Sequence, residues 1–249
     1  MLDQARTVEQ VVSLAASAQA FAEELIEEAK RRTNAPPVAC HAGCPWCCHV
    51  TVTTTIPEVI QISEYLRAAA GVQGAEGLHV DTIDEYVDRV RGLSLQQRAV
   101  LRLRCPVQDP ATAYCSLWPI RPLLCRSWTS ADVSKCRQAF YEPSKDIRAP
   151  VLRVQRDIAQ AVGAGLVAGL RSAGLEGGAV YLADALQVAL AEPDAATRWL
   201  AGEPAFEDAE VGDQCLIVVE GGAGELAPAR ATQTPGTRCG FAVTAAAGA

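Results

Sequence analysis

Apolar residues recur at helical spacing along most of the first two hundred positions. Between residues 3 and 32, valine, alanine, leucine and isoleucine follow the three-to-four-residue interval of one helical face. Lys30, Arg31 and Arg32 come at the end of this run, where basic groups complement the helix dipole, and Pro36 and Pro37 follow. The pattern predicts an amphipathic helix over residues 3–32.

Further segments show the same spacing. Thr55-Ile56-Pro57-Glu58 looks like a helix start, with a Thr cap, a Pro in the first turn and a Glu near the positive end of the dipole. This helix is expected to end near Gly71. Other helices are predicted over residues 81–91, 95–104, 148–173, 179–191 and 195–201, with short ones after Pro119 and near Asp132. The segments typical of strands are residues 50–55, 215–219 and 241–243, so we expect a mainly α, irregular helical domain.

The pattern weakens near the C-terminal end. Residues 203–249 are rich in Gly, Pro and Ala and carry few large apolar groups, which predicts a poorly ordered tail after a helical domain at residues 1–202. Val151–Leu170 is the most apolar long stretch, but Arg153, Arg156 and Asp157 interrupt it. A membrane span needs about 20 residues with almost no charge, so no membrane partner is expected.

Composition narrows the class of protein. The chain has 249 residues, of which 49% are hydrophobic and 20% charged, as in an ordinary soluble globular protein. Its net charge of −7 argues against a nucleic-acid binder. The charge is uneven, because residues 98–172 hold 12 basic and 5 acidic groups within an otherwise acidic chain. This basic middle either offsets the negative charge of thiolates or is a solvated helix face.

Ten cysteines are present, and eight of them lie between Cys40 and Cys136. The first residues lack the basic end and apolar run of a signal peptide, so we expect a cytoplasmic protein. In a reducing compartment, clustered cysteines bind metal more often than they form disulfides. A disulfide-bonded exported protein is therefore the less favoured alternative.

The first cysteine block is Cys40, Cys44, Cys47 and Cys48, with the spacing C-x3-C-x2-C-C. Gaps of two or three residues let thiolates converge on one ion while backbone N–H groups point at the sulfurs, as in zinc knuckles and iron–sulfur loops. Adjacent side chains point in different directions on a strand or helix. We therefore expect Cys48 to point away from Cys47, with one of the two completing this site and the other facing a second metal or the core.

The second block is Cys105, Cys115, Cys125 and Cys136. Its gaps of nine and ten residues are too long for a knuckle but suit ligands that separate turns bring to a site begun elsewhere. We expect the two blocks to build one shared centre or two adjoining ones. Two four-thiolate zinc sites and one [4Fe–4S] cluster with spare thiols both remain open, and the sequence does not choose zinc over iron. The alternative for some of these cysteines is burial as small hydrophobes.

Two arginines accompany the second block. Arg121 and Arg126 are candidate cofactor-binding residues, because a fixed cation lowers a thiol pKa and stabilises a negative cluster. Their alternative role is hydrogen bonding to loop carbonyls. Trp46, Trp118 and Trp128 suit an apolar shell around the site. His41 and His49 are weaker ligand candidates, and Cys215 and Cys239 lie outside the pattern and are not expected to be ligands.

These motifs together resemble a known family. The cysteine run at residues 40–48, Cys105-Pro106-Val107, Tyr114-Cys115-Ser116-Leu117-Trp118 and Arg121-Pro122-Leu123-Leu124-Cys125-Arg126 are similar to the YkgJ-type cysteine-cluster proteins, whose domain is described as zinc- or iron-chelating. The first gap is three residues instead of two, and Leu117-Trp118 replaces the usual Ile-Tyr. The resemblance covers about residues 38–130 and implies zinc, iron or iron–sulfur binding. A similar cysteine module occurs in flagellin lysine N-methylases, but the family implies no agreed reaction.

Two functions follow as expectations. The first is a metal-binding protein that takes part in metal handling or in a modification pathway, with an unidentified protein or peptide partner. The second is an enzyme for redox chemistry or peptide modification in which the metal centre takes part, with its catalytic residues unknown. Cys40, Cys44 and Cys47 also have the spacing of radical S-adenosylmethionine enzymes, but no alternating strand–helix pattern follows them. The chain lacks GxSxG, P-loop, GxGxxG-before-helix and HExxH motifs.

Overall fold

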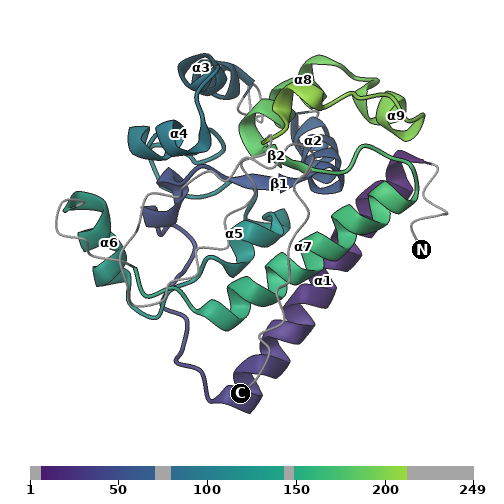
Figure 1. Ribbon diagram of the computed structural model, residues 1–249. Helices are drawn as coiled ribbons and strands as arrows, with labels where there is room; N and C mark the ends of the chain where they lie inside the picture. The colour runs from purple at the N-terminus through teal and green to yellow at the C-terminus, as the bar shows by residue number, and fades with distance from the viewer. Residues whose placement is uncertain (1–6, 71–79, 143–148, 212–249) are drawn as a thin grey trace, which may run out of the picture.

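The computed structural model describes residues 7–70, 80–142 and 149–211, and within these ranges it is mainly helical, as predicted (Figure 1). The α-helices are α1 (Val8–Thr33), α2 (Ile56–Ala70), α3 (Val80–Val90), α4 (Leu95–Leu101), α5 (Leu123–Ser127), α6 (Val133–Tyr141), α7 (Arg153–Ser172), α8 (Leu182–Ala191) and α9 (Ala195–Leu200). Two short strands, β1 (Thr53–Thr55) and β2 (Ala179–Tyr181), complete the regular structure together with short 3-10 turns. None of the described helices is long and apolar enough to cross a membrane.

Helix α1 begins and ends with local signals. Thr7 and Gln10 form a reciprocal capping box at its start, and Asn34 adopts a left-handed conformation at its end. Its buried side chains include Val11, Ala15 and Ile26, and this face packs against α2 and α7. Figure 1 shows α1 and α7 as two long helices lying side by side. The helix predicted at residues 3–32 is confirmed where the structure describes it.

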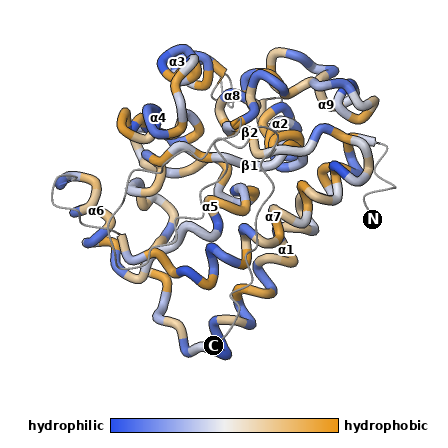
Figure 2. Tube along the Cα trace, viewed as in Figure 1, coloured by the Kyte–Doolittle hydropathy of each residue, from blue (hydrophilic) through white to orange (hydrophobic). Residues whose placement is uncertain are grey.

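The main core surrounds α2. Ile56, Val59, Ile60 and Ile62 are all fully buried, so this helix is covered on nearly every side of its first two turns. It packs against α1 and α8, and Figure 2 shows hydrophobic positions along it. Helix α5 lies between this layer and α7, which it also contacts. The core thus supports β1, which follows the first cysteine block, and α5, which carries Cys125.

The two strands correct one helix boundary. β1 pairs with β2 in antiparallel register, with Thr53 opposite Tyr181 and Thr55 opposite Ala179. The helix predicted at residues 179–191 therefore starts only at residue 182. β-Branched and aromatic residues favour a half-buried strand, and pairing with a distant segment overrides the helical spacing of this stretch. β1 confirms the extended character predicted for part of residues 50–55.

Residues 203–211 also differ from expectation. Phe206 and Ala209 are fully buried, and Val211 donates its N–H to the carbonyl oxygen of Ala179 over 3.0 Å. The expected tail therefore does not begin at residue 203, because this segment closes the core beside β2. The rest of the expected tail, including the strand predictions at residues 215–219 and 241–243, lies outside the described residues.

Candidate metal centre

The first cysteine block lies in the loop after α1 and on a short 3-10 helix, η2 (Trp46–His49). The N–H of Cys44 donates to the carbonyl oxygen of His41 over 3.1 Å, which closes a tight turn. Gly43 within this turn has a φ of +85°, and a Cβ there would stand 3.5 Å from the Tyr114 ring. The left-handed backbone explains the glycine between Cys40 and Cys44. Cys47 and Cys48 follow on η2.

The second block folds back onto the first. The N–H of Cys105 donates to the carbonyl oxygen of Cys48 over 2.7 Å, and the N–H of Ala39 donates to that of Ser130 over 2.9 Å. These two bonds join both ends of the first block to the second block. The two blocks therefore lie together, although more than 50 residues separate them in sequence. That they build a shared centre or two adjoining ones stays a prediction.

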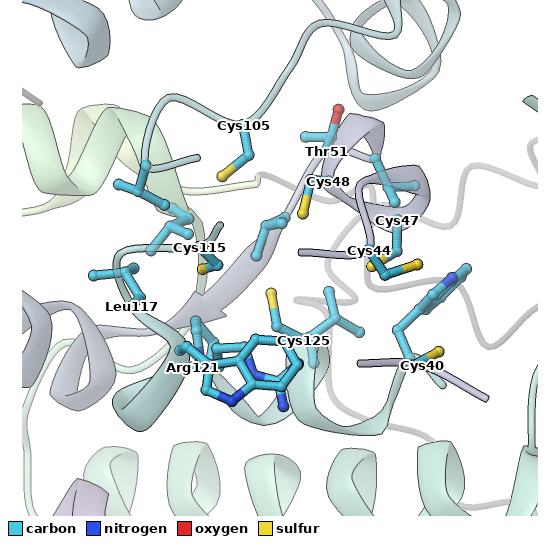
Figure 3. A pocket seen from close by; sticks show the side chains of 18 of the residues that line it. Cys40, Cys44, Cys47, Cys48, Thr51, Cys105, Cys115, Leu117, Arg121 and Cys125 are labelled. Atoms are coloured by element: carbon cyan, nitrogen blue, oxygen red, sulfur yellow. The ribbon is translucent and has the colours of Figure 1, made fainter. Parts of the chain in front are cut away.

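Seven of the eight cysteines line one cavity of about 270 Å³. They are Cys40, Cys44, Cys47, Cys48, Cys105, Cys115 and Cys125. In Figure 3 the side chains of Cys48, Cys105, Cys115 and Cys125 point toward a common space, while Cys40, Cys44 and Cys47 gather on one side of it. The thiols thus come from four separate segments of the chain and meet at one place.

A second cavity of about 240 Å³ adjoins the first. It shares Cys40, Cys44 and Cys47 with the first cavity and adds Cys136 from α6. Trp46, His49, Ser130 and Phe140 also line it. The three shared cysteines therefore form part of the wall between the two cavities.

Cys47 and Cys48 are neighbours on η2, but they line different spaces. Both line the first cavity, and only Cys47 also lines the second. Interaction between the two thiols lowers the pKa of Cys47 to about 7 and raises the pKa of Cys48. The expectation that the two thiols serve different sites stays a prediction.

Backbone amides point at several of the sulfurs. The N–H of Ser130 donates to Cys40 Sγ over 3.2 Å. Burial raises the pKa of Cys44, Cys105 and Cys115, and in each case a hydrogen bond from the backbone N–H two residues later opposes this rise. Amides placed in this way stabilise the thiolate form, which is the form that binds metal.

Burial dominates at the deepest thiols. It raises the pKa of Cys105 to about 12 and raises the pKa of Cys125 as well. Both thiols are therefore protonated at neutral pH unless a positive charge is supplied. A divalent ion supplies such a charge and deprotonates a coordinating thiol.

Arg121 lies beside the thiols, as expected. Its guanidinium stacks on the Trp118 ring at 3.7 Å from the ring centre, and the residue lines the first cavity. Its buried Nε has no hydrogen-bond partner among the described residues. At Cys47 the neighbouring Cys48 thiol lowers the pKa most, burial raises it, and the positive charge of Arg121 lowers it further. The same charge opposes the burial that raises the pKa of Cys115. An anionic thiolate centre would fit this orphaned donor.

Arg126 has a different environment. Its Nε donates to the carbonyl oxygen of Arg121 and its Nη2 to that of Pro119, each over 2.6 Å, and it pairs with Glu23 of α1. It is absent from the lining of both cavities. The structure therefore gives Arg126 the alternative role of bonding to loop carbonyls, and it fastens α5 to α1 instead of facing the thiols.

The aromatic residues surround the site as predicted. Trp118 and Trp128 line the first cavity, and Trp46 and Trp128 line the second. His41 lines the first cavity. His49 lines the second, where its Nδ1 lies 3.0 Å from the carbonyl oxygen of Arg102. These rings give the thiols a largely apolar surrounding.

Sequence reasoning missed how Glu58 supports the site. Its carboxylate accepts hydrogen bonds from the N–H of Leu123 over 2.6 Å and from the hydroxyl of Thr54 over 2.8 Å. Leu123 starts α5, so this buried carboxylate ties the helix that carries Cys125 to β1 and α2. The sequence showed Glu58 only as a first-turn acidic residue, and nothing in it indicated the bond to Leu123.

All eight described cysteines are free thiols. As they stand, no three His, Cys, Asp or Glu side chains in residues 7–70, 80–142 and 149–211 are arranged to hold a metal ion. Ligation therefore requires the thiols to close around the ion, and the ligand role of each cysteine stays a prediction.

Comparison with protein families identifies the segment that carries the thiols. Residues 39–145 match the family described as "CxxCxxCC: Putative zinc- or iron-chelating domain". This range contains all eight cysteines of the two blocks, and the match confirms the resemblance drawn from the motifs. Neither the curated proteins nor the solved structures gave a match.

Proposed function

We propose that this chain, whose residues 39–145 carry the zinc- or iron-chelating CxxCxxCC domain, is a metal-binding protein that holds zinc or an iron–sulfur centre through cysteine thiolates. The observation that carries the proposal is the meeting of eight free thiols, from five separate segments, around two adjoining cavities. Backbone N–H groups donate to the sulfurs of Cys40, Cys44, Cys105 and Cys115. Cysteines that served only as packing residues would not need these donors.

The donor set fits both metals. Four thiolates form a closed tetrahedral zinc site, and four thiolates also hold an iron–sulfur cluster. Arg121 and the amide N–H groups would balance the excess negative charge of such a centre. Because both metals accept this set, the structure supports zinc and iron equally.

The direct test is metal analysis of the full chain purified without oxygen. We expect stoichiometric zinc, or iron with acid-labile sulfide and a broad visible absorption band. Replacing Cys44 or Cys47 with Ser should remove most of the metal and lower stability, because metal binding is coupled to folding at such sites.

Cys215 and Cys239 provide matched controls, because both lie outside the cysteine motif. Cys215→Ser and Cys239→Ser should keep the metal content of the unaltered chain. Equal metal content in all four variants, or a chain that binds neither metal, would refute the proposed function.

The size of the first cavity favours a second candidate function. About 270 Å³ is more than an ion needs, and apolar side chains such as Val52, Leu117 and Leu182 line much of the space beside the thiols. An enzyme that uses the centre for redox chemistry or for modification of an apolar peptide side chain would use this space. A reversible reduction of the visible band in the loaded chain would support it, whereas a chain loaded only with zinc would exclude redox at the centre.

The proposal places the protein in the cytoplasm, in metal handling or in a modification pathway. Free thiols persist where glutathione and thioredoxin keep them reduced. Fractionation of cells that make a tagged chain tests the location, and recovery with an exported or membrane fraction would contradict it.

A further inference from the structure

We propose that the eight thiolates form two neighbouring four-thiolate centres, and that each centre takes three ligands from one sequence block and one from the other. The first set is Cys48, Cys105, Cys115 and Cys125, and the second set is Cys40, Cys44, Cys47 and Cys136. This inference rests on the metal-binding function proposed above and adds the number of centres and the ligands of each.

The first set is defined by the cavity it lines. Cys48, Cys105, Cys115 and Cys125 all line the first cavity, and none of them lines the second. Figure 3 shows their side chains directed toward the same space. The bond from the N–H of Cys105 to the carbonyl oxygen of Cys48 fixes the one member that comes from the first block.

The second set is defined by Cys136. This residue lines only the second cavity, where Cys40, Cys44 and Cys47 are the other cysteines. Helix α6, which carries Cys136, packs against η2. The N–H of Ser130 donates to Cys40 Sγ just before Asp132 caps the start of α6, so one short segment positions both Cys40 and Cys136.

Coordination number supports two centres over one. A closed zinc or iron–sulfur site takes four protein thiolates, so a single centre would leave four of these eight clustered thiols without a ligand role. A division by sequence block would place Cys48 in the set that contains Cys40 and Cys44. The cavity lining places it with Cys105, Cys115 and Cys125 instead.

Two double Cys→Ser variants of the full chain distinguish these arrangements. Cys44→Ser with Cys136→Ser removes two ligands of the same proposed centre but of different sequence blocks. Cys44→Ser with Cys48→Ser removes two ligands of the same block but of different centres. We expect the first variant to keep half of the metal of the unaltered chain and the second to keep almost none, by zinc and iron analysis per chain after anaerobic purification.

Each alternative gives another result. Half occupancy in the Cys44/Cys48 variant with none in the Cys44/Cys136 variant would show a division by block and overturn the inference. One centre per unaltered chain would overturn it too while leaving the proposed function intact. Absence of metal from the unaltered chain would instead refute the proposed function itself.

Alkylation mapping of single variants covers the case in which a double variant fails to fold. In Cys136→Ser, we expect iodoacetamide to modify Cys40, Cys44 and Cys47 while Cys105, Cys115 and Cys125 stay protected. In Cys48→Ser the pattern should reverse. Uniform protection or uniform modification in both variants would contradict two separate centres.

Discussion

Glu58 shows how one buried side chain connects the core to a cysteine-bearing helix. It is only 1% exposed, and its carboxylate accepts hydrogen bonds from Thr54, Thr55 and Leu123. Gln19 of α1 adds a longer bond of 3.4 Å. A buried charge with this many donors is stabilising only while the whole network is intact.

Glu58→Ala should lower the free energy of unfolding by about 3 kcal/mol, because it leaves several buried donors without an acceptor. Urea unfolding followed by circular dichroism measures the change. Glu64→Gln on the same helix is the control, because Glu64 is only partly buried and, among the described residues, it forms an i,i+3 ion pair with Arg67, which is worth less than about 1 kcal/mol. Equal losses in the two variants would contradict the role given to Glu58.

Arg121 should affect metal binding through charge. Without its cation the neighbouring thiols have higher pKa values, so protons compete better with the metal. As pH falls, Arg121→Ala should therefore lose half of its metal at a pH higher than the unaltered chain does, by roughly 0.5–1 pH unit. Arg121→Lys should recover part of the difference.

The comparison for this prediction is Arg126→Ala. Arg126 bonds to loop carbonyls and to Glu23, so its loss should lower stability and leave the pH of half metal loss nearly unchanged. A metal titration against pH, with zinc or iron measured after gel filtration, gives both values. An identical pH shift in the two variants would show that Arg121 acts only through the fold.

At the scale of elements, one glycine within α7 and one just after it have different surroundings. Gly165 lies within α7, and a Cβ added there meets no atom within 4 Å. Gly165→Ala should therefore stabilise the chain by about 0.5–1 kcal/mol. Ala has a higher helix propensity than Gly, and it lowers the conformational entropy of the unfolded chain. Thermal unfolding measures the gain.

Gly177, just after α7, gives the opposite expectation. A Cβ there would lie 3.1 Å from the carbonyl oxygen of Val167 and 3.0 Å from Arg171 Cγ. Gly177→Ala should lower the melting temperature because backbone must shift to admit the methyl group. A gain at Gly177, or a loss at Gly165, would show that these glycines are not limited by space.

The helices were predictable where local spacing decides them. α1, α2 and α3 follow their apolar periodicity closely. Residues 179–181 did not, because their strand depends on pairing with β1, more than 120 residues earlier. Phe206 was also missed, since one aromatic among Gly, Pro and Ala gives no periodic signal even though it is fully buried.

The residues of the candidate site could be predicted from the sequence, but the assignment of the cysteines to two sets could not. Spacing and motif identified the eight cysteines and Arg121. In the division proposed above, Cys48 joins one set and Cys136 the other. This assignment rests on the winding of η2 and on the packing of α6 against η2, which spacing does not encode. Arg126 follows Cys125 in sequence, yet it faces α1.

For the molecule as a whole, the apolar core and the thiol-bearing segments differ in what stabilises them. The main core is built from α2, α8 and their neighbours, with buried residues such as Ile60, Leu186 and Trp199. By contrast, η2 and α6 contain no fully buried residue. Ring contacts of Trp46 and His49 with Phe140 join η2 to α6, and a few hydrogen bonds, including the one from Ser130 to Cys40, add to them.

Metal removal should accordingly loosen one part of the molecule and spare the rest. We expect a strong chelator to increase hydrogen–deuterium exchange in residues 40–49 and 128–142, because the proposed thiolate–metal bonds would tie these segments to the rest of the site and few buried side chains do so. Helices α1, α2 and α8 should keep their protection, since buried apolar area stabilises them without metal. Exchange measured by mass spectrometry before and after chelation, with zinc or iron added back to test reversal, checks this. Cooperative loss of protection in all helices would mean that the thiol centres stabilise the whole fold, and unchanged exchange at residues 40–49 would mean that metal is not bound there.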